Sequence, residues 1–130
     1  SEEIEQECVW IRENLGLDVP LHFSAFHPDF MMRDKPNTPP ETLTRARRIA
    51  IEQGLRYVYV GNVHDESGSS TYCPGCGAKL IGRDWYRMTA WNLDDHGRCK
   101  KCGTSIPGRL EAKPGTWGAR RELVNMRAFA

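Results

Sequence analysis

The spacing of apolar residues at the start of the chain predicts a helix over residues 4–15. Apolar side chains recur there at intervals of three and four, which is typical of one helical face. They are Ile4, Cys8, Ile11 and Leu15. Gly16 follows directly, at a position where glycine often ends a helix. Cys8 belongs to this face, so we interpret it as a small buried residue and not as a reactive thiol.

A short segment between prolines, residues 20–26, predicts a strand. Alternation would place its side chains on two faces: Leu21, Phe23 and Ala25 against His22, Ser24 and Phe26. A loop broken by Pro28 and Pro36 then leads to Thr38.

The sequence Thr38-Pro39-Pro40-Glu41 predicts the start of a second helix through a capping box. In that motif Thr38 accepts from the third helical amide, and Pro39 occupies the first helical position. The expected buried stripe consists of Leu43, Ala46, Ile49 and Ala50. Gly54 would end the helix, and the β-branched and aromatic residues at 56–61 predict another strand.

Residues 1–64 therefore predict an α/β arrangement of helix, strand, helix and strand. A helical crossover between two strands implies parallel pairing. Parallel sheets are normally covered on both faces, which two helices cannot achieve alone. We expect the remaining cover to come from a larger barrel, from a partner or second copy, or from the rest of this chain.

The chain changes character after a polar linker at residues 65–71. Net charge is −5 over residues 1–66 and +4 over residues 67–110, and the second region has short β segments rich in glycine. We expect a small β module at 65–110 and a tail at 111–130. The tail carries a helical spacing of apolar residues at Ala119, Leu123, Met126 and Ala130.

Overall composition narrows the class of protein. Lys and Arg total 18 against 17 Asp and Glu, so a strongly basic nucleic-acid-binding protein is not indicated. No apolar run approaches the roughly 18 residues of a membrane helix, and no signal-peptide pattern is visible. The odd count of five cysteines favours a reducing, cytoplasmic setting over a disulfide framework.

The strongest chemical signal is a pair of C-x2-C-G motifs, with 22 residues between Cys76 of the first and Cys99 of the second. They supply Cys73, Cys76, Cys99 and Cys102. Two intervening residues let both sulfurs of a tight turn face one ion, so the two turns predict a closed four-thiolate zinc site. The same motifs resemble those of rubredoxin, so iron remains the alternative.

Basic residues near these motifs, Lys79, Arg98, Lys100 and Lys101, are expected to offset the thiolate charge. His96 lies close enough in sequence to substitute as a ligand, although a surface position is favoured.

Two stretches together resemble a known family. The first runs from Trp10-Ile11-Arg12-Glu13-Asn14 through Pro20–Phe30, Thr38–Leu43 and Tyr57–Val63. The second comprises Thr71–Gly77, Gly97–Gly103 and Ile106-Pro107-Gly108. These motifs are similar to the C-terminal portion of the AmmeMemoRadiSam-system radical SAM proteins, relatives of pyruvate formate-lyase activating enzyme.

The resemblance implies the last βα units of a partial βα-barrel, followed by a zinc ribbon. It implies a role for His27 near S-adenosylmethionine, and it places His27, Asp29, Asn62 and His64 at the functional ends of the strands. The family's 4Fe–4S cluster needs a C-x3-C-x2-C loop, but Ser69 stands where such a pattern would require a third cysteine before Cys73 and Cys76.

We therefore expect no S-adenosylmethionine cleavage by this chain alone. Two other functions remain open: a stand-alone zinc-ribbon interaction module and a rubredoxin-like one-electron carrier.

Overall fold

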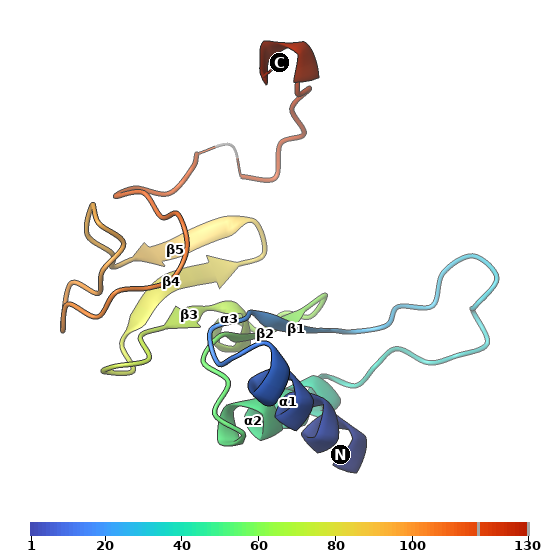
Figure 1. Ribbon diagram of the computed structural model, residues 1–130. Helices are drawn as coiled ribbons and strands as arrows, with labels where there is room; N and C mark the ends of the chain where they lie inside the picture. Colours follow the sequence, from blue (N-terminus) through green and yellow to red (C-terminus); the bar gives the residue numbers. More distant parts are fainter. Residues whose placement is uncertain (117, 130) are drawn as a thin grey trace.

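Two small sheets organise the chain. The structure is a computed structural model, and it describes residues 1–116 and 118–129. The first sheet pairs β1 (Leu21–Ser24) with β2 (Val58–Gly61) in parallel, in register from Leu21 opposite Val58 to Ser24 opposite Gly61. The second is antiparallel, in the order β3-β4-β5. Figure 1 shows the second sheet on one side of the first and the long helices on the other.

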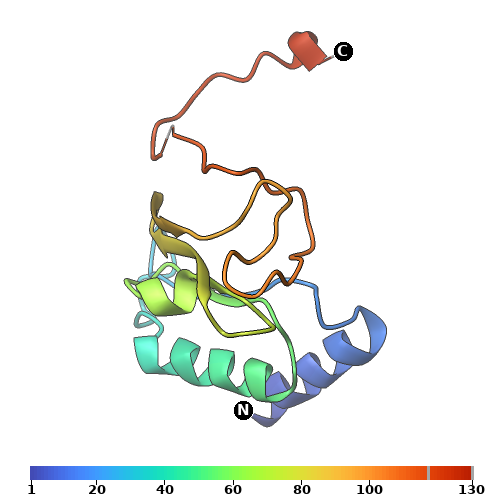
Figure 2. The ribbon, with the colours of Figure 1, turned by 90° about the vertical axis from the view of Figure 1, so that its left-hand side faces the viewer.

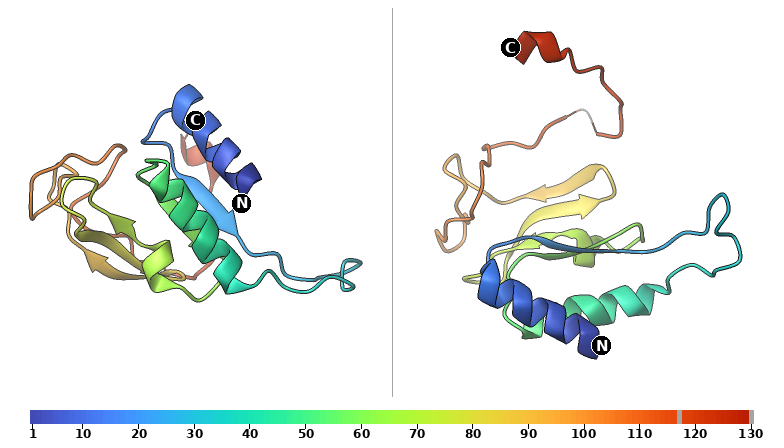
Figure 3. Two further views of the ribbon diagram at one scale, coloured as in Figure 1. Left: turned by 90° about the horizontal axis from the view of Figure 1, so that it is seen from below. Right: turned by 45° about the vertical axis from the view of Figure 1, so that its right-hand side comes forward.

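Helices α1 (Glu2–Asn14) and α2 (Pro40–Glu52) cover one face of the parallel sheet. Figure 3 shows them side by side beneath β1. A core cluster joins all four elements; its buried members are Cys8, Ile11, Ala50, Leu55 and Val58. Leu21 and Phe23 pack against this cluster while His22 and Ser24 face away, which confirms the predicted alternation of β1. The mixed α/β class and the parallel pairing are as expected from the sequence.

The predicted stripe of α2 is confirmed, because Leu43, Ala46, Ile49 and Ala50 are all buried. In α1 the prediction is wrong at one position: Leu15 is 54% exposed. Leu15 is the C-cap residue, with φ −113°, so its side chain has left the helical face. Gly16 follows with φ +97°, the left-handed conformation expected of a residue just past a helix end.

The predicted capping box does not form. Helix α2 begins at Pro40, and its N-cap is Pro39 in an extended conformation without a side-chain cap. Thr38 instead pairs with Phe26: its hydroxyl accepts from the Phe26 amide at 2.9 Å, and its own amide donates to the Phe26 carbonyl at 3.1 Å. The second proline explains the difference, since a residue before proline is driven out of the helical region.

The segment predicted as a polar linker is structured. It contains α3 (Glu66–Ser69), whose first turn is capped by the Asp65 carboxylate accepting from the Gly68 amide at 2.9 Å, and β3 (Thr71–Tyr72). Gly68, Ser70 and Thr71 are buried, because this segment packs between β2 and β4. Polar composition misled the prediction, since the hydroxyls of Ser69 and Ser70 donate to the backbone carbonyls of Val60 and Glu66.

Strands β4 (Lys79–Asp84) and β5 (Arg87–Trp91) complete the second sheet, and bridges at Leu93 and Arg98 extend it toward Cys99 and Ser105. A second core lies between the two sheets. Its buried members are Tyr57, Cys73, Leu80, Ile81, Leu93, Cys99 and Ile106, with Tyr59, Trp91 and Leu110 at its edge. The four-cysteine module thus covers part of the face that the helices leave open, where Tyr57 and Tyr59 pack into its core, while His22 and Ser24 of β1 stay exposed. Cover by the rest of this chain is one of the three covers that the sequence allowed.

The C-terminal tail leaves the body of the molecule, as Figures 1 and 2 show. It contains one 3-10 turn, Met126–Phe129, so the predicted amphipathic helix is wrong for residues 119–125; Ala130 lies outside the described residues. Leu123 is fully exposed, and a helix this short is marginal without a surface to pack on. Within the described ranges, no helix has the length and apolar character needed to cross a membrane.

Candidate metal centre

The two cysteine turns have the same backbone design. In the first, the Cys73 amide donates to the Ala78 carbonyl at 2.8 Å, and the Gly77 amide donates back to Cys73 at 2.9 Å. The second repeats this pattern at the equivalent positions, with Cys99 to Thr104 at 2.9 Å and Gly103 to Cys99 at 2.8 Å. Both closing glycines have φ near +75°, a conformation that L side chains resist. The C-x2-C-G spacing therefore dictates the local structure directly.

The two turns bring all four sulfurs together. Every pair of Sγ atoms among Cys73, Cys76, Cys99 and Cys102 lies within 4.8 Å. Cys73 Sγ is 3.5 Å from Cys102 Sγ, and Cys76 Sγ is 3.8 Å from Cys99 Sγ. A tetrahedral ion with metal–sulfur bonds of about 2.3 Å separates its sulfurs by about 3.8 Å. The cluster is thus positioned to hold a metal ion with little rearrangement.

Burial divides the four thiols into two inner and two outer members. Cys73 and Cys99 belong to the core between the sheets, whereas Cys76 and Cys102 are exposed. The inner pair fixes the site to the fold, since its side chains pack against Leu80 and Leu93 within the same core. Loss of the site should therefore disturb the core that joins the two sheets.

Hydrogen bonds prepare this cluster to carry negative charge. The hydroxyl and the amide of Thr104 lower the pKa of Cys102 to about 6. Burial acts to raise the pKa of Cys73, but the amides of Cys76 and Gly75 donate to its sulfur and hold that pKa below its ordinary value.

The Cys76 thiol behaves in the opposite way. The Ala78 amide acts to lower the pKa of Cys76, but desolvation and the neighbouring sulfurs raise it to about 11. A metal ion binding all four sulfurs must therefore displace protons, so metal affinity should fall as pH falls.

The basic residues expected near the site have separate roles. Lys79 Nζ lies 2.9 Å from the Glu66 carboxylate, and Arg98 Nε lies 3.1 Å from the Asp94 carboxylate. The sequence predicted that both cations would offset the thiolate charge. Each instead has an acidic partner of its own. Lys100 and Lys101, inside the second turn, are exposed and have no ion pair among the described residues. They remain the local cations for that role.

Two residues near the site were either missed or ambiguous in the sequence. The sequence analysis did not identify Thr104 as part of the site. Its hydroxyl lies 3.1 Å from the Cys102 sulfur. The signal for this contact is its position directly after Gly103, two residues from Cys102. A side chain at Gly75 would collide with Thr104, so the two turns also pack against each other. His96 contacts Asp95 at 3.7 Å and lies outside the sulfur cluster, as favoured from the sequence.

The residues at the ends of the parallel strands are not brought into one site. His27 is exposed on the long loop after β1, where its Nδ1 lies 3.3 Å from the Asp29 carboxylate. Asn62 turns back and donates from Nδ2 to the Ala25 carbonyl at 2.9 Å. His64 reaches the other sheet and accepts from the Trp85 indole. Cys8 is buried between the helices, remote in the fold from the four-cysteine cluster.

Comparison with known proteins finds a similar chain in an archaeon. Over 98 residues this protein is 53% identical to the uncharacterized protein MJ0808 of Methanocaldococcus jannaschii. The match covers 75% of this chain and 29% of that protein, so the chain spans less than a third of the relative's length. No protein-family model matches the sequence, and no solved structure matches it. The relative's name assigns no activity.

Proposed function

We propose that the four cysteines hold one structural Zn²⁺ ion that stabilises the β module of this chain. The observation that carries the proposal is the pair of identical turns whose sulfurs lie 3.5 and 3.8 Å apart. Four thiolates leave no open coordination position, which is typical of structural zinc and not of hydrolytic zinc. The burial of Cys73 and Cys99 in the core supports a role in folding.

Iron is the second candidate, with the site acting as a rubredoxin-like one-electron carrier. The observation that favours it is the exposure of Cys76 and Cys102, because an exposed sulfur shortens the path for an electron from a partner. Thiolate ligands alone do not discriminate between the two metals. The proposal of zinc therefore rests on the position of the site, with Cys73 and Cys99 in the core of the β module.

For the wider setting, we infer that residues 1–64 are terminal βα units of a radical SAM barrel of the activating-enzyme type. The parallel pair β1–β2, joined through α2, supports this, as does the greater length of the archaeal relative. In that setting the sheet beside β1 would be completed by the rest of the barrel, by another protein or by a second copy of this chain. His27 would approach S-adenosylmethionine. The 4Fe–4S cluster would belong to the rest of the protein, in the cytoplasm.

Metal content and optical spectra test the proposed ion. We expect one zinc per chain by elemental analysis, with no visible absorption, after purification in metal-supplemented medium. A red, reversibly bleachable protein with one iron per chain would instead establish the electron-carrier alternative. The matched variants are Cys102→Ser, which should lose the metal, and Cys8→Ala, which should keep it.

A separate assay tests the radical SAM setting. The chain alone, reconstituted with iron and sulfide under strong reductant, is expected to release no 5′-deoxyadenosine above the control without protein. Release from this chain would contradict our assignment of its cysteines. The length of the natural reading frame decides between a segment of a larger enzyme and a stand-alone zinc-ribbon interaction module: an upstream C-x3-C-x2-C motif in the same frame supports the former.

A further inference from the structure

A cleft of about 610 Å³ lies between the parallel sheet and the β4–β5 hairpin, away from the cysteine cluster. Its floor includes His22 and Tyr59 of the sheet, and its far wall includes Trp85 and Tyr86 at the tip of the hairpin. Figure 1 shows this hairpin extending over the sheet. The volume falls within the range of roughly 300–1,000 Å³ that is usual for small-molecule sites.

Aromatic rings line both sides of the cleft. The His22 ring stacks on the Tyr59 ring, with centroids 4.9 Å apart and 27° between the planes. On the hairpin side, the Trp85 indole donates to His64 Nδ1 and packs against that ring with a centroid distance of 5.7 Å. Aromatic side chains on both sides of one cleft suit a planar ligand, because ring contacts add to the burial of apolar area.

The backbone of Trp85 is held in an unfavourable conformation. Its φ is +52°, in the left-handed region that bulky side chains rarely adopt and that glycine adopts freely. A glycine would relieve the turn, but it would also remove this indole from the wall of the cleft. Strain of this kind persists where the surroundings stabilise it, and it is concentrated at functional sites.

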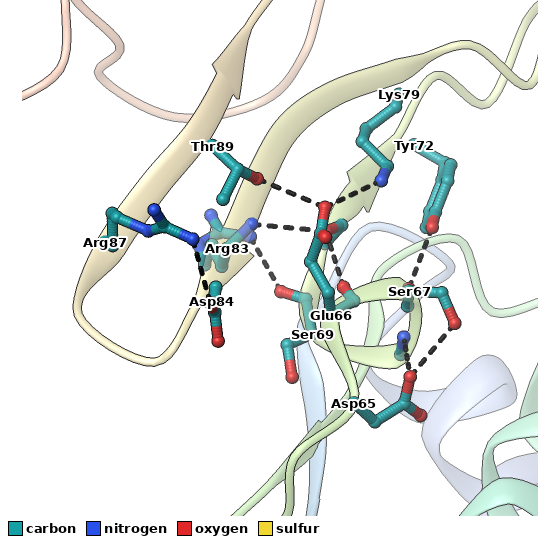
Figure 4. A network of polar contacts seen from close by, with 12 residues as sticks. Asp65, Glu66, Ser67, Ser69, Tyr72, Lys79, Arg83, Asp84, Arg87 and Thr89 are labelled. Carbon is teal, nitrogen blue, oxygen red and sulfur yellow. Dashed lines mark hydrogen bonds and ion pairs between the residues drawn. The ribbon is translucent and has the colours of Figure 1, made fainter.

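A positive charge without an acidic partner lines the same cleft. Arg83 is half-buried; its Nη1 donates to the Thr71 hydroxyl at 2.8 Å and to the Ser69 carbonyl at 3.2 Å, as Figure 4 shows for Ser69. Its guanidinium lies 5.4 Å from the centroid of the Tyr59 ring. No carboxylate of the described residues forms an ion pair with it, and none of the described residues lining the cleft is acidic.

Nearby acidic groups are already neutralised. Asp84 pairs with Arg87 at 3.1 Å, and Glu66 pairs with Lys79 at 2.9 Å. Figure 4 shows Arg87 and Lys79 directed at these carboxylates, while Arg83 points toward Ser69. The unpaired cation of the hairpin is therefore the one at the cleft.

We propose that this cleft binds a planar aromatic anion, with its ring against the Trp85 indole and the anionic group at Arg83. The guanidinium presents several N–H donors in one plane, which matches the two oxygens of a carboxylate or phosphate. This site is distinct from the metal centre and goes beyond the function proposed for it. A carboxylate and a phosphate share the required chemistry, and the experiment separates them.

Calorimetric titration of the metal-loaded 130-residue chain tests the proposal with matched probes. The carboxylate arm compares 2-naphthoate with the uncharged 2-naphthamide and with the ringless acetate. The phosphate arm compares uridine 5′-monophosphate with uridine and ribose 5-phosphate. We expect at least one planar anion to bind about tenfold tighter than its uncharged analogue, and the ringless anions to bind weakest. The arm that shows this preference identifies the class of anion.

Variants on the hairpin assign the effect to the residues named. Arg83→Gln should weaken binding of the charged probe about tenfold, which removes its preference over the uncharged analogue. Arg87→Gln is the matched control, because its cation lies on the same hairpin but is paired with Asp84. Trp85→Gly should weaken charged and uncharged planar probes alike, in a chain that remains folded because glycine suits its backbone.

Metal content, measured in each sample, shows whether the β module is intact. Equal binding of charged and uncharged probes by the metal-loaded chain would overturn this proposal and leave the metal assignment untouched. So would a preference that survives Arg83→Gln. Absence of metal in the wild-type chain would count against the proposed function instead.

Discussion

At the scale of single residues, Cys8 and Cys102 show how position decides what a thiol does. Cys8 is fully buried among apolar side chains, and burial raises its pKa. Cys102 is exposed and receives hydrogen bonds from Thr104 that lower its pKa to about 6. The first behaves as a small apolar residue. The second is prepared to bind a metal as a thiolate.

Replacement of either cysteine should therefore have a different effect. Cys102→Ser is expected to reduce bound metal well below one per chain, because serine does not supply a thiolate. Cys8→Ala should retain full metal content and lose only about 1 kcal/mol of stability, since it removes one buried sulfur from the helix core. Elemental analysis and urea denaturation measure the two effects. Equal metal loss in both variants would contradict this division of roles.

Glu66 should make stability depend on pH in a defined direction. Hydrogen bonds from Lys79 and Thr89 lower the pKa of Glu66 from its ordinary 4.5. The folded state thus favours the ionised form, so the contribution is fully present above pH 4.5 and is lost as the pH falls through the lowered value. The group is exposed, and the effect should be small.

A comparison of variants isolates this contribution. The difference in unfolding free energy between wild type and Glu66→Gln should be constant above pH 4.5 and shrink below it, as measured by urea denaturation with metal content monitored. Glu122→Gln, in the exposed tail, is the control and should show no such difference. A gap that grows on acidification would show that the sign is wrong.

At the scale of elements, the long loop between β1 and α2 is closed at its base by two hydrogen bonds between Phe26 and Thr38. The loop carries Phe30, Met31 and Met32, which are all largely exposed to solvent. Its closure therefore depends on the Thr38 hydroxyl and backbone. This is the role that Thr38 takes in place of the helix cap.

Thr38→Val should consequently destabilise the chain by about 1 kcal/mol, because the half-buried Phe26 amide loses its acceptor. Thr38→Ser keeps a hydroxyl and should retain most of the stability. Hydrogen exchange of the Phe26 amide provides the local readout, with faster exchange expected only in the valine variant. If the exchange rate of that amide does not change, the hydroxyl is not its acceptor in solution.

Helix α3 depends on the absence of a side chain at position 68. An alanine Cβ there would lie 2.6 Å from Cγ2 of Val60 on β2 and would also collide with Asp65, the N-cap. Gly68→Ala should cost about 1–3 kcal/mol, as is usual for overpacking. Ser67→Ala, on the exposed side of the same short helix, is the control and should change thermal stability little. Similar melting temperatures for the two variants would argue against close packing of α3 on β2.

At the scale of the whole molecule, two cores share one parallel sheet. The helix side is built from Cys8, Ile11, Ala50, Leu55 and Val58 and contains no metal-site cysteine. The other side includes Cys73 and Cys99 together with Tyr57 of the sheet. The first core can therefore persist without the metal, whereas the second depends on a small module of the kind that usually needs a metal to fold.

Chelation should unfold residues 71–106 while part of the helical circular dichroism remains. Amide spectra should show loss of dispersion in the β module and retention of signals from α1 and α2. Restoring the metal should reverse the change. An unaltered spectrum for the β module after verified metal removal would mean that the metal does not hold it together.

The sequence alone determined the features that depend on short-range spacing. The C-x2-C-G motifs dictate turns whose hydrogen bonds and positive-φ glycines are local, so the sulfur cluster could be predicted without the fold. The stripe of α2 and the alternation of β1 followed from periodicity in the same way.

Only the tertiary structure decided which surfaces meet. Glu66, Ser69 and Ser70 look like linker residues in the sequence, but packing between two sheets makes them partners of Lys79, Arg83 and the backbone. The cleft is decided in the same way: His22 and Tyr59 come from the parallel sheet, whereas Arg83 and Trp85 come from β4 and the turn that follows it. No local pattern encodes such contacts, because they form only when apolar faces that the local elements leave uncovered pack together. In this protein, part of the open face of β1–β2 packs against the core of the four-cysteine module.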